Sequence, residues 1–192
     1  MNKKYLLAGL FVASLGSTSI AAAGAGDAYA GFSLGNVSQD ASGYDIDDTI
    51  GWKVFGGYAL NDVLAIEGGY TTFGDADWGF SGNPPPPGFS TSLETTGIEI
   101  AAVGNFPINS QFSLFGKVGL LSWDSEISFS GPGSSDSADD TGTDVFFGFG
   151  GQYEIAGNLA VRASWERYTV TIDDADLDAD IDFLSVSAVF GF

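Results

Sequence analysis

The sequence predicts an all-β fold, an eight-stranded antiparallel up-and-down transmembrane β-barrel. Three observations predict it. Alternation of apolar residues with small or polar ones recurs eight times along the 192 residues. The segments between these stretches are alternately short and long. The chain also ends on an alternating apolar strand, at a position where polar residues are usual: Leu184, Val186, Ala188, Phe190 and Phe192.

Residues 1–23 have the features of a secretory signal rather than of a buried helix. Lys3 and Lys4 precede an apolar stretch over 5–15 that is too short to span a membrane, and small residues follow. We expect export through the Sec pathway, cleavage after Ala23 or alternatively after Ala30, and a barrel domain over 24–192. Cleavage after Ala23 leaves four of the 6 basic residues against 25 acidic ones, 4 − 25 = −21, which argues against nucleic acid as a partner.

The alternating stretches predict strands over 28–37, 50–59, 63–73, 92–105, 111–123, 143–154, 158–170 and 180–192. Their short connections are 60–62, 106–110 and 155–158. Their long connections, which hold most of the acidic residues and have the composition of loops, are 38–49, 74–91, 124–142 and 171–179. An up-and-down barrel produces this pattern when one end stays compact, and eight strands then bring both termini to the short-turn end.

Side-chain size predicts which face points outward. One set is bulky and the other is mostly Gly, Ala and Ser, and a bore of eight strands is only just wide enough to be filled by side chains. The small set also has too little charge to dissolve a barrel exterior, which argues against the alternative of a soluble barrel. The set expected to face lipid is Phe32, Leu34, Trp52, Val54, Tyr58, Leu64, Ile66, Tyr70, Ile98, Ile100, Phe112, Leu114, Val118, Leu120, Val145, Phe147, Phe149, Tyr153, Leu159, Val161 and Trp165.

Three stretches resemble the OmpA-like transmembrane domain family of Gram-negative outer membranes. They are YAGFSLG over 29–35, GWKVFGGYALNDVLAIEGGYTTFG over 51–74, and the terminal pair Phe190 and Phe192. The resemblance implies residence in the cell outer membrane, and Phe190 with Phe192 resembles the signal read by the outer-membrane assembly machinery. Many family members continue into a peptidoglycan-binding domain, and this chain stops at the barrel, so tethering to the cell wall is not carried over.

Six charged residues share the inward parity of their strands: Lys53, Glu67, Glu99, Lys117, Arg162 and Glu166. A bore that is half dry makes an unpaired charge costly, so these are candidates for ion pairs. A turn symmetric about Ile108 would set Glu99 directly opposite Lys117. Two interpretations stay open: a static polar plug, or a gate like the ion pairs proposed for the family. Arg167 has lipid-facing parity and is expected to contact lipopolysaccharide phosphates or to snorkel.

The acidic run over 173–182 suggests calcium, with Asp174, Asp176 and Asp178 as weak divalent-cation candidates. Ala179 stands where the calcium loop of an EF-hand needs Gly, and Ser185 stands where it needs Glu, so no specific metal site and no cofactor are expected. Divalent ions bridging these carboxylates to lipopolysaccharide, or a simply solvated rim, remain the alternatives.

The chain contains 0 histidines, the usual base of hydrolases and acyltransferases, which argues against an enzyme. We therefore expect a monomeric, non-enzymatic barrel in contact with outer-membrane lipids and lipopolysaccharide, with a structural role in membrane integrity and acidic surface loops. The alternatives are a narrow, salt-bridge-gated ion pore, and an adhesion or host-interaction protein that acts through 74–91 and 124–142.

Overall fold

The structure, a computed structural model, describes residues 26–41, 44–45, 48–77, 90–131, 134–172 and 177–192. Its strands are β1 (Ala28–Ala41), β2 (Tyr44–Asp45), β3 (Thr49–Ala59), β4 (Leu64–Asp77), β5 (Ser90–Pro107), β6 (Phe112–Gly131), β7 (Ser134–Ala156), β8 (Leu159–Ile172) and β9 (Leu177–Gly191). No helix in these ranges is long and apolar enough to cross a membrane. The predicted signal, residues 1–23, lies outside the described residues.

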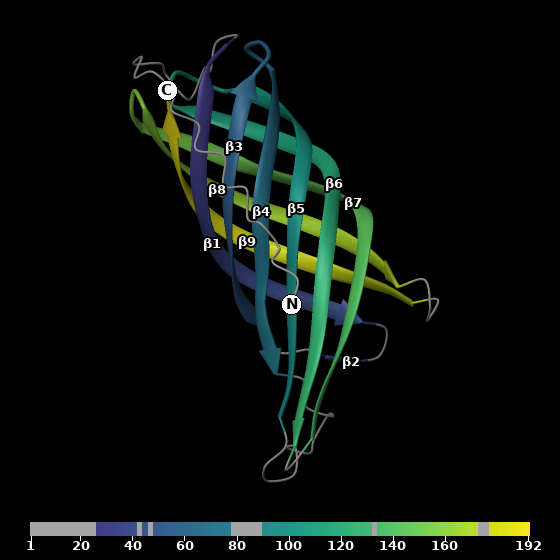
Figure 1. Ribbon diagram of the computed structural model, residues 1–192. Helices are drawn as coiled ribbons and strands as arrows, with labels where there is room; N and C mark the ends of the chain where they lie inside the picture. Colours follow the sequence, from purple (N-terminus) through teal and green to yellow (C-terminus); the bar gives the residue numbers. More distant parts are fainter. Residues whose placement is uncertain (1–25, 42–43, 46–47, 78–89, 132–133, 173–176) are drawn as a thin grey trace.

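The strands form one closed antiparallel barrel (Figure 1). Each barrel strand pairs with the next along the chain, and β9 returns to pair with β1 from Tyr29↔Gly191 to Ala41↔Ala179. The backbone N–H of Phe192 donates to the carbonyl of Ala28 at 2.8 Å and extends this closing ladder. β2 is a two-residue strand against the end of β1. The predicted barrel of eight strands is therefore confirmed, because β2 adds no wall of its own.

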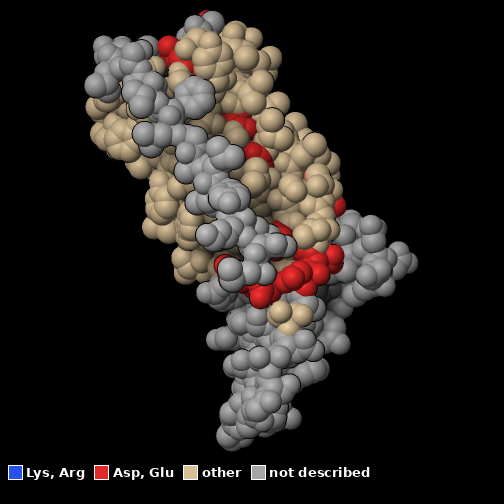
Figure 2. Space-filling view, in the orientation of Figure 1, with Lys and Arg blue, Asp and Glu red and all other residues tan. Residues whose placement is uncertain are grey.

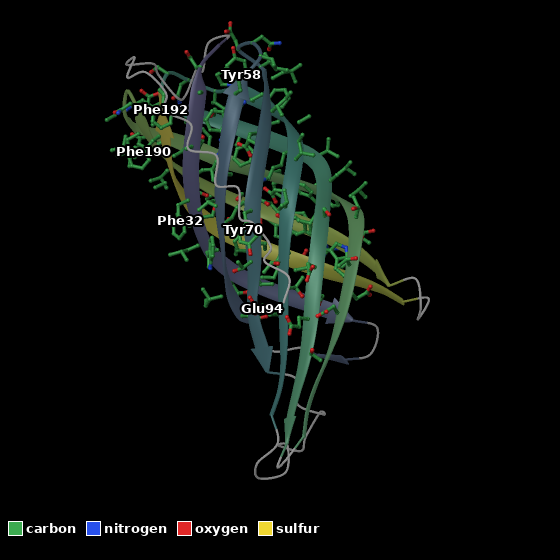
Figure 3. The ribbon with its side chains drawn as sticks, in the orientation of Figure 1. Phe32, Tyr58, Tyr70, Glu94, Phe190 and Phe192 are labelled. Carbon is green, nitrogen blue, oxygen red and sulfur yellow. The ribbon has the colours of Figure 1, made fainter. Side chains whose placement is uncertain are left out.

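Bulky apolar side chains cover the outside of the barrel, as their size predicts. Ile98 is 67% exposed and Val145 is 62% exposed, whereas their neighbours Glu99 and Phe146 point inward and are buried. Figure 3 shows Phe32 and Phe190 projecting from the outside of the wall. The described outer face of the wall carries few charged side chains in the view of Figure 2, and it is the inner face that carries the buried polar groups. Burial thus follows the pattern of a membrane barrel and excludes the soluble orientation.

Two of the short turns use the same side-chain chemistry. The Oδ1 atom of Asn61 accepts hydrogen bonds from the backbone N–H groups of Val63 and Leu64, each at 2.9 Å. The Oδ1 atom of Asn109 likewise accepts from Gln111 and Phe112, at 2.9 and 2.8 Å. An asparagine side chain therefore satisfies backbone donors that a tight turn leaves without a strand partner.

The outer ends of β5, β6 and β7 extend further than the sequence predicts. β6 and β7 stay paired as far as Gly131↔Ser134, so the prediction of a loop over 124–142 is wrong for the described residues. Strands that rise above the bilayer are solvated on both faces and need no apolar alternation. Ser, Thr, Gly and Asp therefore give these strand ends the composition of a loop.

Candidate functional site

A layer of charged side chains crosses the bore near its middle. It contains the six residues that parity predicts to be inside: Lys53 from β3, Glu67 from β4, Glu99 from β5, Lys117 from β6, and Arg162 and Glu166 from β8. All six are buried, and the most exposed of them, Lys117, reaches only 7%. Three cationic groups thus face three carboxylates in one enclosed layer, so their formal charges cancel.

Glu166 is the central anion of this layer. It accepts a hydrogen bond from the Nζ atom of Lys53, and its Oε1 atom lies 2.7 Å from the Nζ atom of Lys117. Lys53 comes from β3 and Lys117 from β6, so a single carboxylate links two distant parts of the wall. The hydroxyl of Tyr168 also lies 2.5 Å from Glu166 Oε2. Side chains from three strands, β3, β6 and β8, therefore converge at Glu166.

Glu99 is bound mainly by charge. Its Oε1 atom lies 3.0 Å from Lys53 Nζ and 4.0 Å from Lys117 Nζ. Its Oε2 atom accepts from Tyr168 at 3.0 Å and from Thr71 at 3.3 Å. The predicted cross-strand pair with Lys117 is wrong, because β5 and β6 pair Glu99 with Leu121 and Val103 with Lys117. The long lysine side chain still reaches toward Glu99 from its position four residues along the strand.

Arg162 and Glu67 form the second half of the layer. The Nη1 atom of Arg162 lies 2.5 Å from Glu67 Oε1, and its Nε atom donates to Gln152 Oε1 at 3.1 Å. The hydroxyl of Tyr29 donates to the same Glu67 oxygen at 2.8 Å. The guanidinium of Arg162 also lies over the ring of Phe115, 4.6 Å from its centroid, where the ring face favours a cation.

The uncharged members of this layer are not among the residues that the sequence predicts. Tyr29, Tyr168, Gln152 and Thr71 all have inward parity, and Tyr168 lies within 2.8 Å of the Lys53 Nζ atom. Their polar character at inward positions is the signal that identifies them, and it is weaker than the signal of a formal charge. They supply the hydrogen bonds that the carboxylates need once water is excluded.

Apolar side chains fill the bore on both sides of the charged layer. Toward the long-strand end lie Val37, Phe73, Ala101, Leu121, Trp123, Phe146, Tyr168, Ile181 and Phe183. Toward the short-turn end lie Tyr29, Phe55, Ala65, Val103, Phe115, Ala160 and Val189. Glycine makes room for the rings, since a Cβ atom on Gly31 would lie 2.2 Å from Phe55 and one on Gly57 would lie 2.2 Å from Tyr29. The described bore is therefore packed, with its ions enclosed between two apolar layers.

The remaining candidates lie away from the bore. Phe190 is exposed on the outside of β9, and Phe192 follows the end of that strand. Arg167 forms a two-fold hydrogen bond with Asp182, at 2.7 and 2.6 Å, and its guanidinium lies over Trp165. Its charge is thus already matched by a carboxylate of β9. Asp174, Asp176 and Asp178 lie outside the residues whose side chains are described.

Comparison with known proteins places this architecture in a family. The family model described as outer membrane protein beta-barrel domain matches residues 8–192. Outer membrane protein A of Salmonella typhi is 28% identical over 157 residues, which cover 77% of this chain and 42% of that protein. The same protein of Klebsiella pneumoniae is 27% identical over 134 residues, which cover 69% of this chain and 37% of that protein. The chain thus spans less than half the length of these relatives.

Solved structures share the fold at lower identity. Neisserial surface protein A superposes with a TM-score of 0.65 and 16% identity, covering 87% of this chain and 99% of that one. Ail, the attachment invasion locus protein of Yersinia pestis, superposes with a TM-score of 0.58 and 20% identity, covering 86% and 99%. A closed barrel with an apolar exterior, a charged and packed bore, and a family match over nearly all of its length identify this chain as a member of the outer membrane protein beta-barrel family, resident in the outer membrane.

Proposed function

We propose that this protein is a non-enzymatic structural element of the outer membrane, a monomeric barrel that seals its own bore. The observation that carries the proposal is the packing of the bore, in which an ion-paired layer lies between two apolar layers. An apolar layer blocks hydrated ions because it offers no group to replace their water. The absence of histidine from the sequence supports a role without catalysis.

The partners in this role are the lipids around the wall. Exposed aliphatic and aromatic side chains supply the contact with acyl chains. Lipopolysaccharide phosphates would meet an acidic outer end, so divalent ions bridging phosphate to carboxylate are the expected form of contact. Phe190 and Phe192 are proposed as the residues that the barrel assembly machinery binds during biogenesis.

Conductance in a planar bilayer tests the seal. Purified, refolded protein should show no ion steps, and it should migrate differently on gels before and after boiling, which shows that the barrel is folded. A matched variant, Phe73→Ala with Phe146→Ala, removes two rings of one apolar layer and leaves the charged layer in place. Discrete current steps from the unmodified protein would refute the seal and favour a pore.

The second candidate is a salt-bridge-gated ion pore. The observation that favours it is the choice of partners open to the lysines: Lys117 lies within 4.0 Å of both Glu99 and Glu67 as well as near Glu166. An exchange of partners would rearrange the layer without leaving a charge unpaired. In that case Glu166→Ala would change the open probability of the channel, whereas a sealed bore would remain silent.

The third candidate is adhesion or host interaction through the segments 74–91 and 124–142. The observation that favours it is the continuation of β6 and β7 as a paired hairpin through most of 124–142. An ordered hairpin presents a fixed surface, which costs less entropy on binding than a loop that must first be ordered. Deletion of that hairpin with a cell-binding assay separates this role from the first two.

A further inference from the structure

The outer part of β7 has a strand partner on one side only. β7 pairs with β6 from Ser134 to Tyr153, but its pairing with β8 begins only at Phe146↔Tyr168. Beyond that point β8 continues with β9 alone, as far as Ile172↔Leu177. Figure 1 shows β7 and β8 diverging there. In the described part of the chain, residues 139–145 of β7 therefore border an open sheet edge, which starts at the rim of the apolar band and runs outward from it.

The hydrogen-bonding direction of these residues follows from the ladder. The backbone N–H of Glu154 donates to Gln111 on the β6 side at 2.8 Å. Successive residues of a strand point their N–H and C=O groups to opposite sides, and the β6–β7 ladder has no register shift. Even-numbered residues of β7 thus face β6, and Asp139, Thr141, Thr143 and Val145 direct their backbone groups toward the open edge.

One of these edge donors is occupied by a side chain instead of a strand. The N–H of Thr141 donates to Oδ1 of its neighbour Asp140 at 2.8 Å. This is the contact expected of a backbone donor that no neighbouring strand takes up, and it can be exchanged for a carbonyl of an added strand.

Side chains along the edge define the chemistry of a partner. Asp139 and Asp140 are exposed near its outer end, and Thr143 and Val145 are exposed nearer the bilayer. Opposite charges on facing strands stabilise a pair and like charges oppose it. The chain carries a formal net charge of −19, so a second copy added edge to edge would bring like charges together.

We propose that the open edge of β7 binds an extended, lysine- or arginine-bearing segment of another protein by addition of a strand. The edge backbone of Asp139, Thr141, Thr143 and Val145 supplies the ladder. Basic side chains of the segment lie beside Asp139 and Asp140, and its β-branched or apolar side chains lie beside Thr143 and Val145. This role goes beyond the structural one and does not depend on whether the bore is sealed.

The test uses the protein refolded in lipid nanodiscs and a fluorescent peptide probe in which a run of valines is followed by two adjacent lysines, so that one lysine lies on each face of the added strand. Two matched probes accompany it: the same peptide with glutamate for lysine, and the same peptide methylated on its backbone nitrogens. We expect binding of the first probe alone, with slower hydrogen exchange at the amides of Thr141 and Thr143. Equal binding of the methylated probe would overturn the proposal, because that peptide cannot form a ladder.

Two variants separate the backbone contribution from that of charge. Thr143→Pro removes an edge donor that β6 does not use, so it should abolish binding while the heat-dependent gel shift of the folded barrel is retained. The pair Asp139→Asn and Asp140→Asn should weaken binding roughly fivefold. Its control, Asp48→Asn with Asp62→Asn, removes two exposed acids away from the edge and should leave binding unchanged.

Other occupants of the edge would be visible in the same experiment. Slow exchange at Thr141 and Thr143 in the free protein would mean that a segment of this chain already pairs there, and would refute the proposal. Self-association of the nanodisc sample that Thr143→Pro abolishes would assign the edge to a second copy, and would also refute it. Binding that Thr143→Pro leaves intact would mean attraction by charge without strand addition.

Discussion

At the scale of single residues, Glu166 is the carboxylate that lies closest to the lysines of the charged layer. It is the only one of the three bore carboxylates that lies within 3.0 Å of both lysines, through one oxygen for each. Glu99 Oε1 lies 3.0 Å from Lys53 Nζ, and Glu67 Oε1 lies 2.5 Å from Arg162 Nη1. Removing Glu166 would therefore leave two buried cations short of an anion, whereas removing either other carboxylate disturbs the set less.

Glu166→Ala should lower the free energy of unfolding by about 3–5 kcal/mol, the usual cost of leaving a buried charge without its partner. Lys117→Ala should lower the free energy of unfolding by less, because Glu166 still forms its ion pair with Lys53. Urea titrations in lipid vesicles, followed by tryptophan fluorescence, measure both. The control is Asp182→Ala, which breaks a partly exposed pair with Arg167 and should cost less than about 1 kcal/mol. The reverse order of Glu166 and Lys117 would contradict the assignment of Glu166 as the central anion.

Strand parity was sufficient to select the six bore charges, because side chains alternate strictly between the two faces of a strand. It was not sufficient to pair them. Glu99 and Lys117 were expected to face each other across a turn centred on Ile108, but the turn is centred two residues later, which moves the register by four. Asn109 causes the difference, since its side chain accepts from Gln111 and Phe112 and delays the start of β6.

At the scale of elements, the β3–β4 and β5–β6 turns are two copies of one design. In each, an asparagine side chain caps two backbone N–H groups, and the residue before it closes the hairpin, with Leu60 N–H bonded to Leu64 and Ile108 N–H bonded to Phe112. These turns fix the registers of two hairpins, and the registers determine which inward side chains meet.

Asn61→Ala and Asn109→Ala should each cost about 1 kcal/mol, since each exposes two backbone donors to water without a protein acceptor. The matched control is Asp62→Ala in the first turn, an exposed residue whose loss should change stability by less than about 0.5 kcal/mol. The same urea titration gives all three values. Unequal costs for the two asparagines, or a cost for Asp62 as large as theirs, would mean that the side-chain caps do not determine turn stability.

The extra length of β5, β6 and β7 was beyond what the sequence could predict. Inside the bilayer, lipid imposes apolar alternation and the strands are visible in the sequence. Above it, both faces are wet, and residues such as Thr141 and Gly142 carry no periodic signal. The pairing of these residues with β6 is set by the continuation of a ladder that begins lower in the barrel.

At the scale of the whole molecule, closure was predictable from one requirement. A sheet edge in hydrocarbon leaves backbone groups unpaired, so the terminal apolar strand had to return to the first one, as β9 does with β1. The direction of the bulky set was predictable for a similar reason, since eight strands leave no space for it inside. The two apolar layers of the bore are not predictable from the sequence in this way, because the inward set is mostly Gly, Ala and Ser and inward rings such as Phe55 and Phe115 are few and far apart along the chain.

Assembly of the whole barrel provides a third prediction. Phe192→Ala with Phe190→Ala should reduce the folded protein in the outer membrane of cells severalfold, while refolding of the purified variant in detergent is retained. The control is Val186→Ala, another exposed apolar residue of β9, which should assemble normally. The fraction of protein that resists unfolding on an unboiled gel gives the measure. Equal assembly of all variants would remove the proposed role of the two phenylalanines.

The six charges of the charged layer add to zero, and this determines how the layer responds to an electric field. A voltage does work on a group of charges in proportion to the net charge that moves through it. The three cations and three carboxylates of the bore carry no net charge between them. A Donnan potential across the outer membrane would therefore do almost no work on this layer if it shifted as a unit, and the six residues of the layer would not sense voltage in that way.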